Sequence, residues 1–191
     1  MKVEFTYYKE FFHVATDNYK EIVKLEKEHS ELFAKASKSN KFIDKLRETD
    51  DRIVRLVLIV VVFCATSLDT YINHYAISHL SRNYFKNYLD KLDLLSKWIV
   101  IPRIITGTQL DAGSRPLQDL SWLITLRNEL LHYKSKKVSV EEIKDTDLLW
   151  GKHAERAIET VKNVAQELKK IDNNISIEWT TTSYNKYPYF D

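Results

Sequence analysis

Hydrophobic positions at the start of the chain recur every three or four residues, which is the period of an α-helix. The apolar residues that follow this period are Phe5, Tyr8, Phe12, Tyr19, Ile22, Val23, Leu32 and Phe33. They predict a helix from residue 4 to about residue 37, which Thr16-Asp17-Asn18 either interrupts or restarts. Lys38-Ser39-Asn40 predicts the end of this helix.

A second long helix is predicted from Thr49 or Asp50, which are both good N-caps, to about Ser81. From Leu56 to Leu68 this helix is apolar on nearly all sides, as is typical of a helix in the centre of a fold. The apolar stretch is shorter than the roughly 20 residues with which a helix spans a bilayer. We therefore expect a buried core helix and no contact with a membrane.

The rest of the chain is predicted to alternate helices with irregular segments. Helical periodicity predicts helices over residues 84–98, 116–132 and 147–171. Pro102 and Pro116 enclose two of the three glycines of the chain, so a long loop is expected between them. After the last helix, an extended tail is expected to the end of the sequence.

The composition agrees with this pattern, because only three glycines and three prolines occur in 191 residues. We expect an all-α protein with an N-terminal helical arm (1–48), a helical bundle (49–172) and an irregular C-terminal tail (173–191). The net charge of +2 neither indicates nor excludes binding of nucleic acid. Cys64 is the only cysteine, and the first residues lack the apolar core of a signal peptide, so we expect a cytoplasmic protein.

One charged residue, Arg127, lies within the apolar face of the helix predicted over residues 116–132. Leucine or isoleucine stands one turn away from it on either side. A guanidinium enclosed by apolar side chains needs a partner, because an unpaired buried charge costs several kcal/mol. Two interpretations follow: Arg127 pairs with a buried carboxylate, for example Asp69, or it lines a cavity that is open to an anion.

His132 is expected at the end of the same helix, one turn after Asn128. Residues four apart share a helix face, so the Asn128 amide could hydrogen-bond the imidazole and fix its tautomer. Arg127 lies about 140° round an ideal helix from His132. The two side chains meet at one ligand only if the helix loosens near His132 or a second subunit completes the site.

The segment Leu126-Arg127-Asn128-Glu129-Leu130-Leu131-His132 resembles the signature of the HEPN superfamily. That signature is an arginine, a polar residue that is often asparagine, a few further residues and then a histidine, near the end of a helix. The stretch from Ala65 to Asn73 resembles an earlier helix of some HEPN groups and places Asp69 at a commonly acidic position. The resemblance covers about residues 50–170 and implies a helical bundle that forms a homodimer with its motifs facing.

Active HEPN proteins are metal-independent RNA endonucleases, so the resemblance implies RNA as the partner and no cofactor or metal. In this chain, His132 would act as general base or acid, and Arg127 would hold the phosphate. Asn128 would orient the histidine or the phosphate, with Asp69 in support. The basic residues that would follow the RNA backbone are Lys134, Lys136 and Lys137.

The usual setting of the family is a toxin or an antiviral-defence role. HEPN toxins that a nucleotidyltransferase antitoxin modifies often carry a tyrosine two residues after the histidine, where this chain has Lys134. That regulation is therefore not expected, and the identity of a partner protein stays open. Many HEPN proteins do not cleave RNA. The alternatives are a non-catalytic domain that binds RNA or a nucleotide, and a structural interaction protein in which Arg127 forms a buried salt bridge.

Other candidate residues are assigned no chemistry. His74 and His79 are five residues apart on the predicted central helix, so they do not share a face and make a poor metal pair. The aromatic residues of the tail, including Trp179, are expected to pack against the bundle in preference to stacking on bases.

Overall fold

The computed structural model of the chain describes residues 7–36, 42–132 and 150–181. All regular structure in these ranges is helical, which confirms the all-α prediction. The elements are α1 (Tyr8–Ala36), α2 (Ile43–His79), α3 (Arg82–Tyr84), a π-helix (Phe85–Leu89), α4 (Leu94–Thr106), α5 (Arg115–Leu131), α7 (Trp150–Ile171) and a 3-10 helix (Glu178–Thr180).

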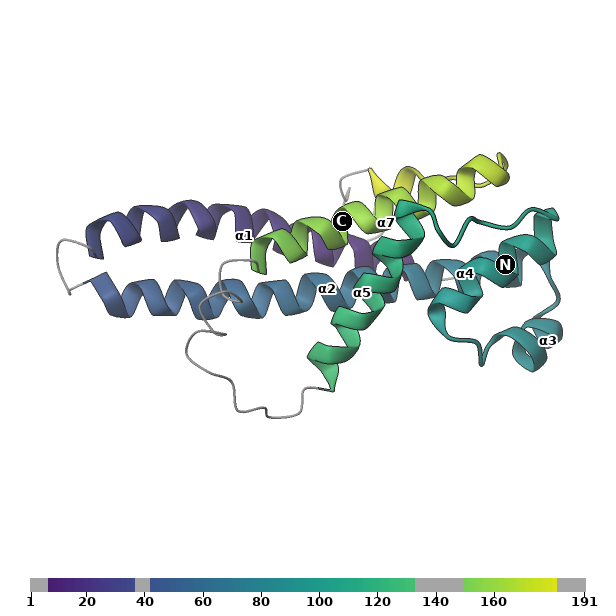
Figure 1. The fold of residues 1–191 in the computed structure, drawn as a ribbon, viewed down its shortest axis with the longest axis horizontal. Helices are drawn as coiled ribbons and strands as arrows, with labels where there is room; N and C mark the ends of the chain where they lie inside the picture. The colour runs from purple at the N-terminus through teal and green to yellow at the C-terminus, as the bar shows by residue number, and fades with distance from the viewer. Residues whose placement is uncertain (1–6, 37–41, 133–149, 182–191) are drawn as a thin grey trace, which may run out of the picture.

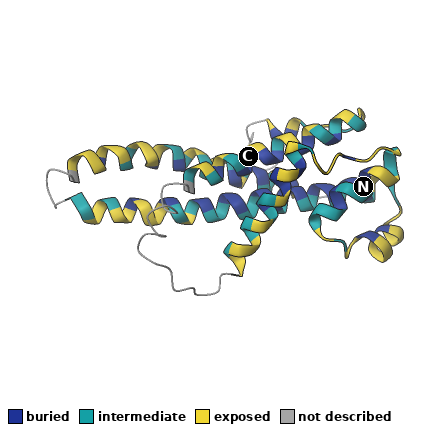
Figure 2. Cartoon of the chain, viewed as in Figure 1, coloured by how far each residue is buried: buried dark blue, intermediate teal, exposed yellow. Residues whose placement is uncertain are grey.

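Helices α1 and α2 form a long antiparallel pair that sets the long axis of the molecule (Figure 1). Helix α7 packs on this pair, and α5 crosses α2 at a steep angle while also packing on α7 (Figure 1). Helix α4 lies against α2 and α5 at the end of the molecule where α2 finishes. The buried residues lie where α7, α5 and α4 cover the helix pair, as the dark blue in Figure 2 shows.

Helix α2 is the centre of the core, as its apolar sequence predicts. Val57, Val60 and Leu68 are fully buried between the helices that surround α2. By length and composition alone α2 could cross a membrane, and 44% of its most apolar 18-residue window is buried inside the fold. The helix begins at Ile43, earlier than the expected caps at Thr49 and Asp50, and Phe42 before it already has helical backbone angles.

The segment around Pro102 differs from its prediction. The helix expected over residues 84–98 is divided before Asp93, whose side chain accepts the backbone N–H of Ser96 at 3.0 Å and caps a new helix, α4. Helix α4 continues through Pro102, which is buried beside Ile101. It ends at Gly107, whose φ of 77° is a left-handed conformation that favours glycine. The loop expected from Pro102 to Pro116 is therefore confined to residues 107–114.

The first and the last helices that the structure describes contribute to one core. Helix α1 buries Phe12 and Ile22 against the bundle, and residue 48, the expected end of the N-terminal arm, lies inside α2. The tail turns back as a 3-10 helix whose Trp179 is 5% exposed and joins the same core. Packing of Trp179 is thus confirmed, while the tail residues from 182 onward lie outside the described residues.

Candidate functional site at the end of helix α5

Helix α5 begins inside the fold and emerges from it before it ends. Pro116 lies in its first turn, where a missing N–H is tolerated. Leu120 and Leu123 are fully buried, as the predicted apolar face requires. In the last turns this face opens, as the teal and yellow at the end of α5 show (Figure 2). Leu131 there is 52% exposed. The residues of the HEPN-like motif therefore lie on the part of α5 that leaves the core.

Arg127 lies at this transition and is half-buried. Its Nη1 donates a hydrogen bond to the Asn128 side-chain oxygen at 2.9 Å. Its Nε is buried and has no hydrogen-bond partner. Within the described ranges, no carboxylate lies within ion-pair distance of the guanidinium. Arg127 is thus a partly desolvated cation whose visible partner is a neutral amide.

Asp69 has a different partner. It accepts a hydrogen bond at 3.2 Å from the Nζ of Lys97, and the Asn73 amide lies 3.3 Å from the same oxygen. The Lys97 side chain is 7% exposed, so this ion pair neutralises a buried ammonium and fastens α4 to α2. Asp69 therefore does not support Arg127. The interpretation in which Arg127 forms a salt bridge with Asp69 is wrong.

His132 follows the last residue of α5 and leaves the helical conformation, with φ −112° and ψ 29°. Its backbone N–H still donates to the Asn128 carbonyl at 2.9 Å, and its side chain is exposed. The helix therefore ends at His132. This is the position at which the helix must loosen if the side chains of Arg127 and His132 are to meet at one ligand. The expected hydrogen bond between the Asn128 amide and the imidazole is not formed in this described turn, and the Asn128 side-chain oxygen accepts a hydrogen bond from Arg127.

An exposed polar stripe runs along α5 to this point. Ser121, Thr125, Asn128 and His132 are all exposed and recur at the spacing of one helix face. Arg127 reaches this stripe from the apolar side through its bond to Asn128. The basic residues expected to follow the RNA backbone, Lys134, Lys136 and Lys137, lie outside the described residues.

A second charged cluster joins α5 to α7, and the sequence analysis did not anticipate it. Asp119 is 8% exposed and accepts hydrogen bonds from Arg156 Nε and Arg115 Nε, each at 2.9 Å. The Arg156 guanidinium also lies 4.0 Å from the centre of the Trp122 ring. Burial, and then the charge of Arg156, lower the pKa of His153, which contacts Trp122. In the sequence, the signal for this cluster was Asp119 itself, because it is an acid one helical turn before Leu123, which is buried.

We expect Arg156→Gln to lower the free energy of unfolding by about 2 to 3 kcal/mol, because a buried carboxylate then loses its main partner. Arg115 bonds the same carboxylate but its side chain is 73% exposed. Arg115→Gln is therefore the matched control, with an expected loss of about 0 to 1 kcal/mol. Urea unfolding of both variants measures the difference. Equal losses would show that burial does not distinguish the two ion pairs.

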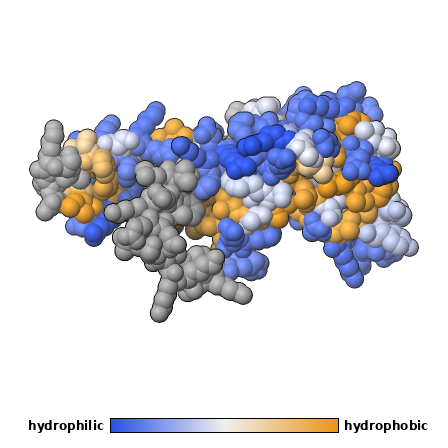
Figure 3. Space-filling view, in the orientation of Figure 1, coloured by the Kyte–Doolittle hydropathy of each residue, from blue (hydrophilic) through white to orange (hydrophobic). Residues whose placement is uncertain are grey.

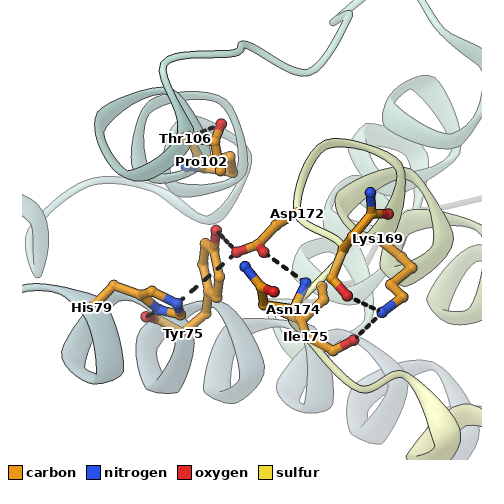
Figure 4. Close-up of polar contacts among 9 residues, drawn as sticks. Tyr75, His79, Pro102, Thr106, Lys169, Asp172, Asn174 and Ile175 are labelled. Atoms are coloured by element: carbon orange, nitrogen blue, oxygen red, sulfur yellow. Dashed lines mark hydrogen bonds and ion pairs between the residues drawn. The ribbon is translucent and has the colours of Figure 1, made fainter.

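A third polar cluster closes the C-terminal end of α7 (Figure 4). The Tyr75 hydroxyl donates to Asp172 at 2.8 Å, the Asn174 backbone N–H donates to the same carboxylate at 3.0 Å, and His79 Nε2 lies 3.9 Å away. The Lys169 ammonium donates to two backbone carbonyls of the turn that follows. Burial alone would raise the pKa of Asp172, but these donors outweigh it and hold the pKa below its ordinary value. The cluster fastens the turn after α7 to α2.

This cluster predicts a pH dependence of stability. Because the pKa of Asp172 is lowered in the folded state, its ionised form stabilises the fold at neutral pH, and that contribution is lost as the pH falls through the folded pKa. We expect Asp172→Asn to be less stable than the native protein by about 1 to 2 kcal/mol at pH 7, with the difference shrinking below about pH 4. Thermal unfolding from pH 7 to pH 3 tests this. Asp51→Asn, an exposed residue of α2, serves as the control and should show no such convergence.

Within the described ranges, no three histidine, cysteine or acidic residues are grouped so that they could hold a metal ion. Of the predicted site residues, the structure brings Arg127 and Asn128 together and leaves His132 exposed on the next turn. No protein-family model, curated protein or solved structure matches the chain.

Proposed function

We propose that this chain is a metal-independent endoribonuclease of the HEPN type, with its site at the end of α5. One observation carries the proposal. Arg127 is a half-buried cation without a described carboxylate partner, and an exposed histidine, His132, follows five residues later at the end of the same helix. A buried charge needs a counter-charge, and at this solvent-facing end of the helix an anionic ligand can supply it.

A phosphodiester suits this arrangement. The guanidinium has several N–H donors in a fixed plane, of which Nη1 is engaged by Asn128 and the buried Nε is unpartnered. The C-terminal end of a helix carries partial negative charge, so the backbone there does not attract an anion. Binding of phosphate at this place therefore depends on Arg127, and Asn128 acts by holding the guanidinium in position.

The proposed reaction is an internal transfer within RNA. The ribose 2′ oxygen forms a bond to the adjacent phosphorus, and the bond from phosphorus to the 5′ oxygen breaks. His132 accepts the proton of the 2′ hydroxyl, while the leaving 5′ oxygen takes a proton from a general acid or from water. The products are a 2′,3′-cyclic phosphate and a 5′ hydroxyl. Arg127 stabilises the charge that develops on the phosphate oxygens.

A second copy of the chain fits the proposal as a partner. The apolar face of α5 opens beside Arg127, where Leu131 is exposed and Ile124 and Leu130 are half-buried. A dimer that covers this face would bring two motifs together and supply the second acid or base of the reaction. The proposed setting is cytoplasmic, as a toxin or antiviral-defence effector.

The same observation supports one alternative, a non-catalytic domain that binds RNA or a nucleotide through Arg127. Both the nuclease and the non-catalytic domain would bind phosphate through Arg127, but only the nuclease needs His132. The structural interpretation, in which Arg127 forms a buried salt bridge, has less support, because Asp69 pairs with Lys97 and the described residues offer Arg127 no other carboxylate.

The deciding experiment is incubation of the purified protein with single-stranded and structured RNAs in excess EDTA. We expect fragments that carry a 2′,3′-cyclic phosphate and a 5′ hydroxyl, identified by mass spectrometry and by labelling of the 5′ ends. An RNA with 2′-O-methyl groups should remain intact, because it lacks the attacking hydroxyl. Binding without cleavage across these RNAs would favour the non-catalytic alternative and contradict the nuclease.

A further inference from the structure

A second surface of the molecule carries exposed aromatic and basic side chains together. It comprises residues 82–91, which we call the 82–91 segment and which contains α3 and the π-helix. Tyr84 is 41% exposed and Tyr88 is 68% exposed, with their ring centres 5.1 Å apart. Figure 1 shows α3 at the end of the molecule beyond α4, well separated from the C-terminal end of α5.

The exposure of the tyrosines is built into the segment. Phe85 and Leu89 are 7% and 3% exposed, and they anchor the π-helix on the core. The widened turn is closed by the Asp90 backbone N–H, which donates to the Phe85 carbonyl at 2.9 Å. With the two anchors pointing inward, Tyr84 and Tyr88 are held outward as a pair. Short π-helices are often found at functional sites.

The same segment also carries a local excess of positive charge. Its basic residues Arg82, Lys86 and Lys91 are all exposed, and Asp90 is its single acid. The segment therefore has a formal charge of +2. A paired aromatic surface bordered by cations is the combination on which single-stranded nucleic acids bind, with bases stacked on rings and phosphates near lysine or arginine.

We propose that the 82–91 segment binds single-stranded RNA, with bases stacking on Tyr84 and Tyr88. The proposal rests on the proposed function only for the choice of RNA over DNA, since the stacking surface does not depend on catalysis. Its distance from the end of α5 makes it a site that holds the substrate strand away from the point of cleavage. Figure 3 agrees with a polar ligand: the lower right, where α3 lies, is pale to blue, below a band of hydrophobic residues.

The test uses the full chain and a fluorescein-labelled single-stranded RNA with 2′-O-methyl groups, which cannot be cleaved by 2′ oxygen attack. Fluorescence anisotropy measures its affinity for the native protein and for Tyr84→Ser/Tyr88→Ser. We expect the double variant to bind at least tenfold more weakly. Tyr7→Ser removes a tyrosine elsewhere whose exposure of 57% lies between those of Tyr84 and Tyr88, and it should change the affinity less than twofold. Circular dichroism confirms that both variants remain helical.

A second measurement does not depend on any variant. The native protein is photo-crosslinked to the same RNA carrying 5-iodouridine, and the modified peptide is expected to contain residues 82–91. The proposal is overturned by any of three results: no RNA binding, an affinity of the double variant within twofold of the native one, or crosslinks confined to other peptides. It is also overturned if the tyrosine substitutions change only self-association in sedimentation, because the surface would then bind protein. If the native protein binds RNA as expected but does not cleave it in the EDTA assay, the proposed nuclease fails and the proposed RNA-binding surface stands.

Discussion

Replacing His132 by alanine is expected to lower the rate of RNA cleavage in EDTA by about 100- to 10,000-fold, the usual contribution of a general acid or base. The side chain is exposed at the first residue after α5, so its removal leaves the core untouched. The unfolding temperature should therefore stay within a degree or two of the native value. Affinity for uncleavable RNA should also change little, because the proposed phosphate ligand is Arg127.

Arg127→Gln should show the complementary pattern, in which both cleavage and RNA affinity fall. Arg47→Gln is the matched control, since it removes one exposed positive charge from α2 and should have little effect on either. Equal cleavage by the native and His132→Ala proteins would exclude His132 from the chemistry. If the site is shared between two copies, a mixture of the His132→Ala and Arg127→Gln proteins should recover part of the activity that each lacks.

The sequence predicted the orientation of α5 well, because that orientation is set by local periodicity. Leu117, Leu120 and Leu123 are buried as expected, and Arg127 lies on the same side of the helix. Where α5 leaves the core was not predictable, because it depends on the lengths and positions of α2 and α7. Because α5 leaves the core at this point, Arg127 is half-buried and, among the described residues, bonds a neutral amide and no carboxylate.

The ion-pair partners of the charged residues could likewise not be predicted from the sequence. Asp69 and Lys97 are 28 residues apart, and Arg156 and Asp119 are 37 apart, so only the folded arrangement of α2, α4, α5 and α7 brings them together. At Pro102 the prediction was wrong, because it relied on the local preference of proline for loops and tertiary packing outweighs that preference here. Proline disfavours a helix interior, but burial of Trp98, Ile101 and Pro102 itself keeps α4 helical through this position.

Trp179 should be among the most important single side chains for stability, although it lies in the segment expected to be an irregular tail. Its ring lies 5.1 Å from Tyr8, 5.6 Å from Phe12 and 4.9 Å from Tyr71, measured between ring centres. It therefore joins the start of α1 to the C-terminal third of α2. Trp179→Ala is expected to lower the free energy of unfolding by about 3 to 5 kcal/mol, because it removes a large buried ring and leaves a cavity.

Phe33→Ala is the control for this substitution, because it removes an aromatic ring that is 63% exposed on α1. Its expected effect is within about 0.5 kcal/mol. Urea unfolding followed by circular dichroism measures both variants on one scale. A loss below about 1 kcal/mol for Trp179→Ala would mean that the tail is not an integral part of the core. The expected large loss would mean that the segment around Trp179, which follows α7, is needed to hold the start of α1 against the C-terminal third of α2.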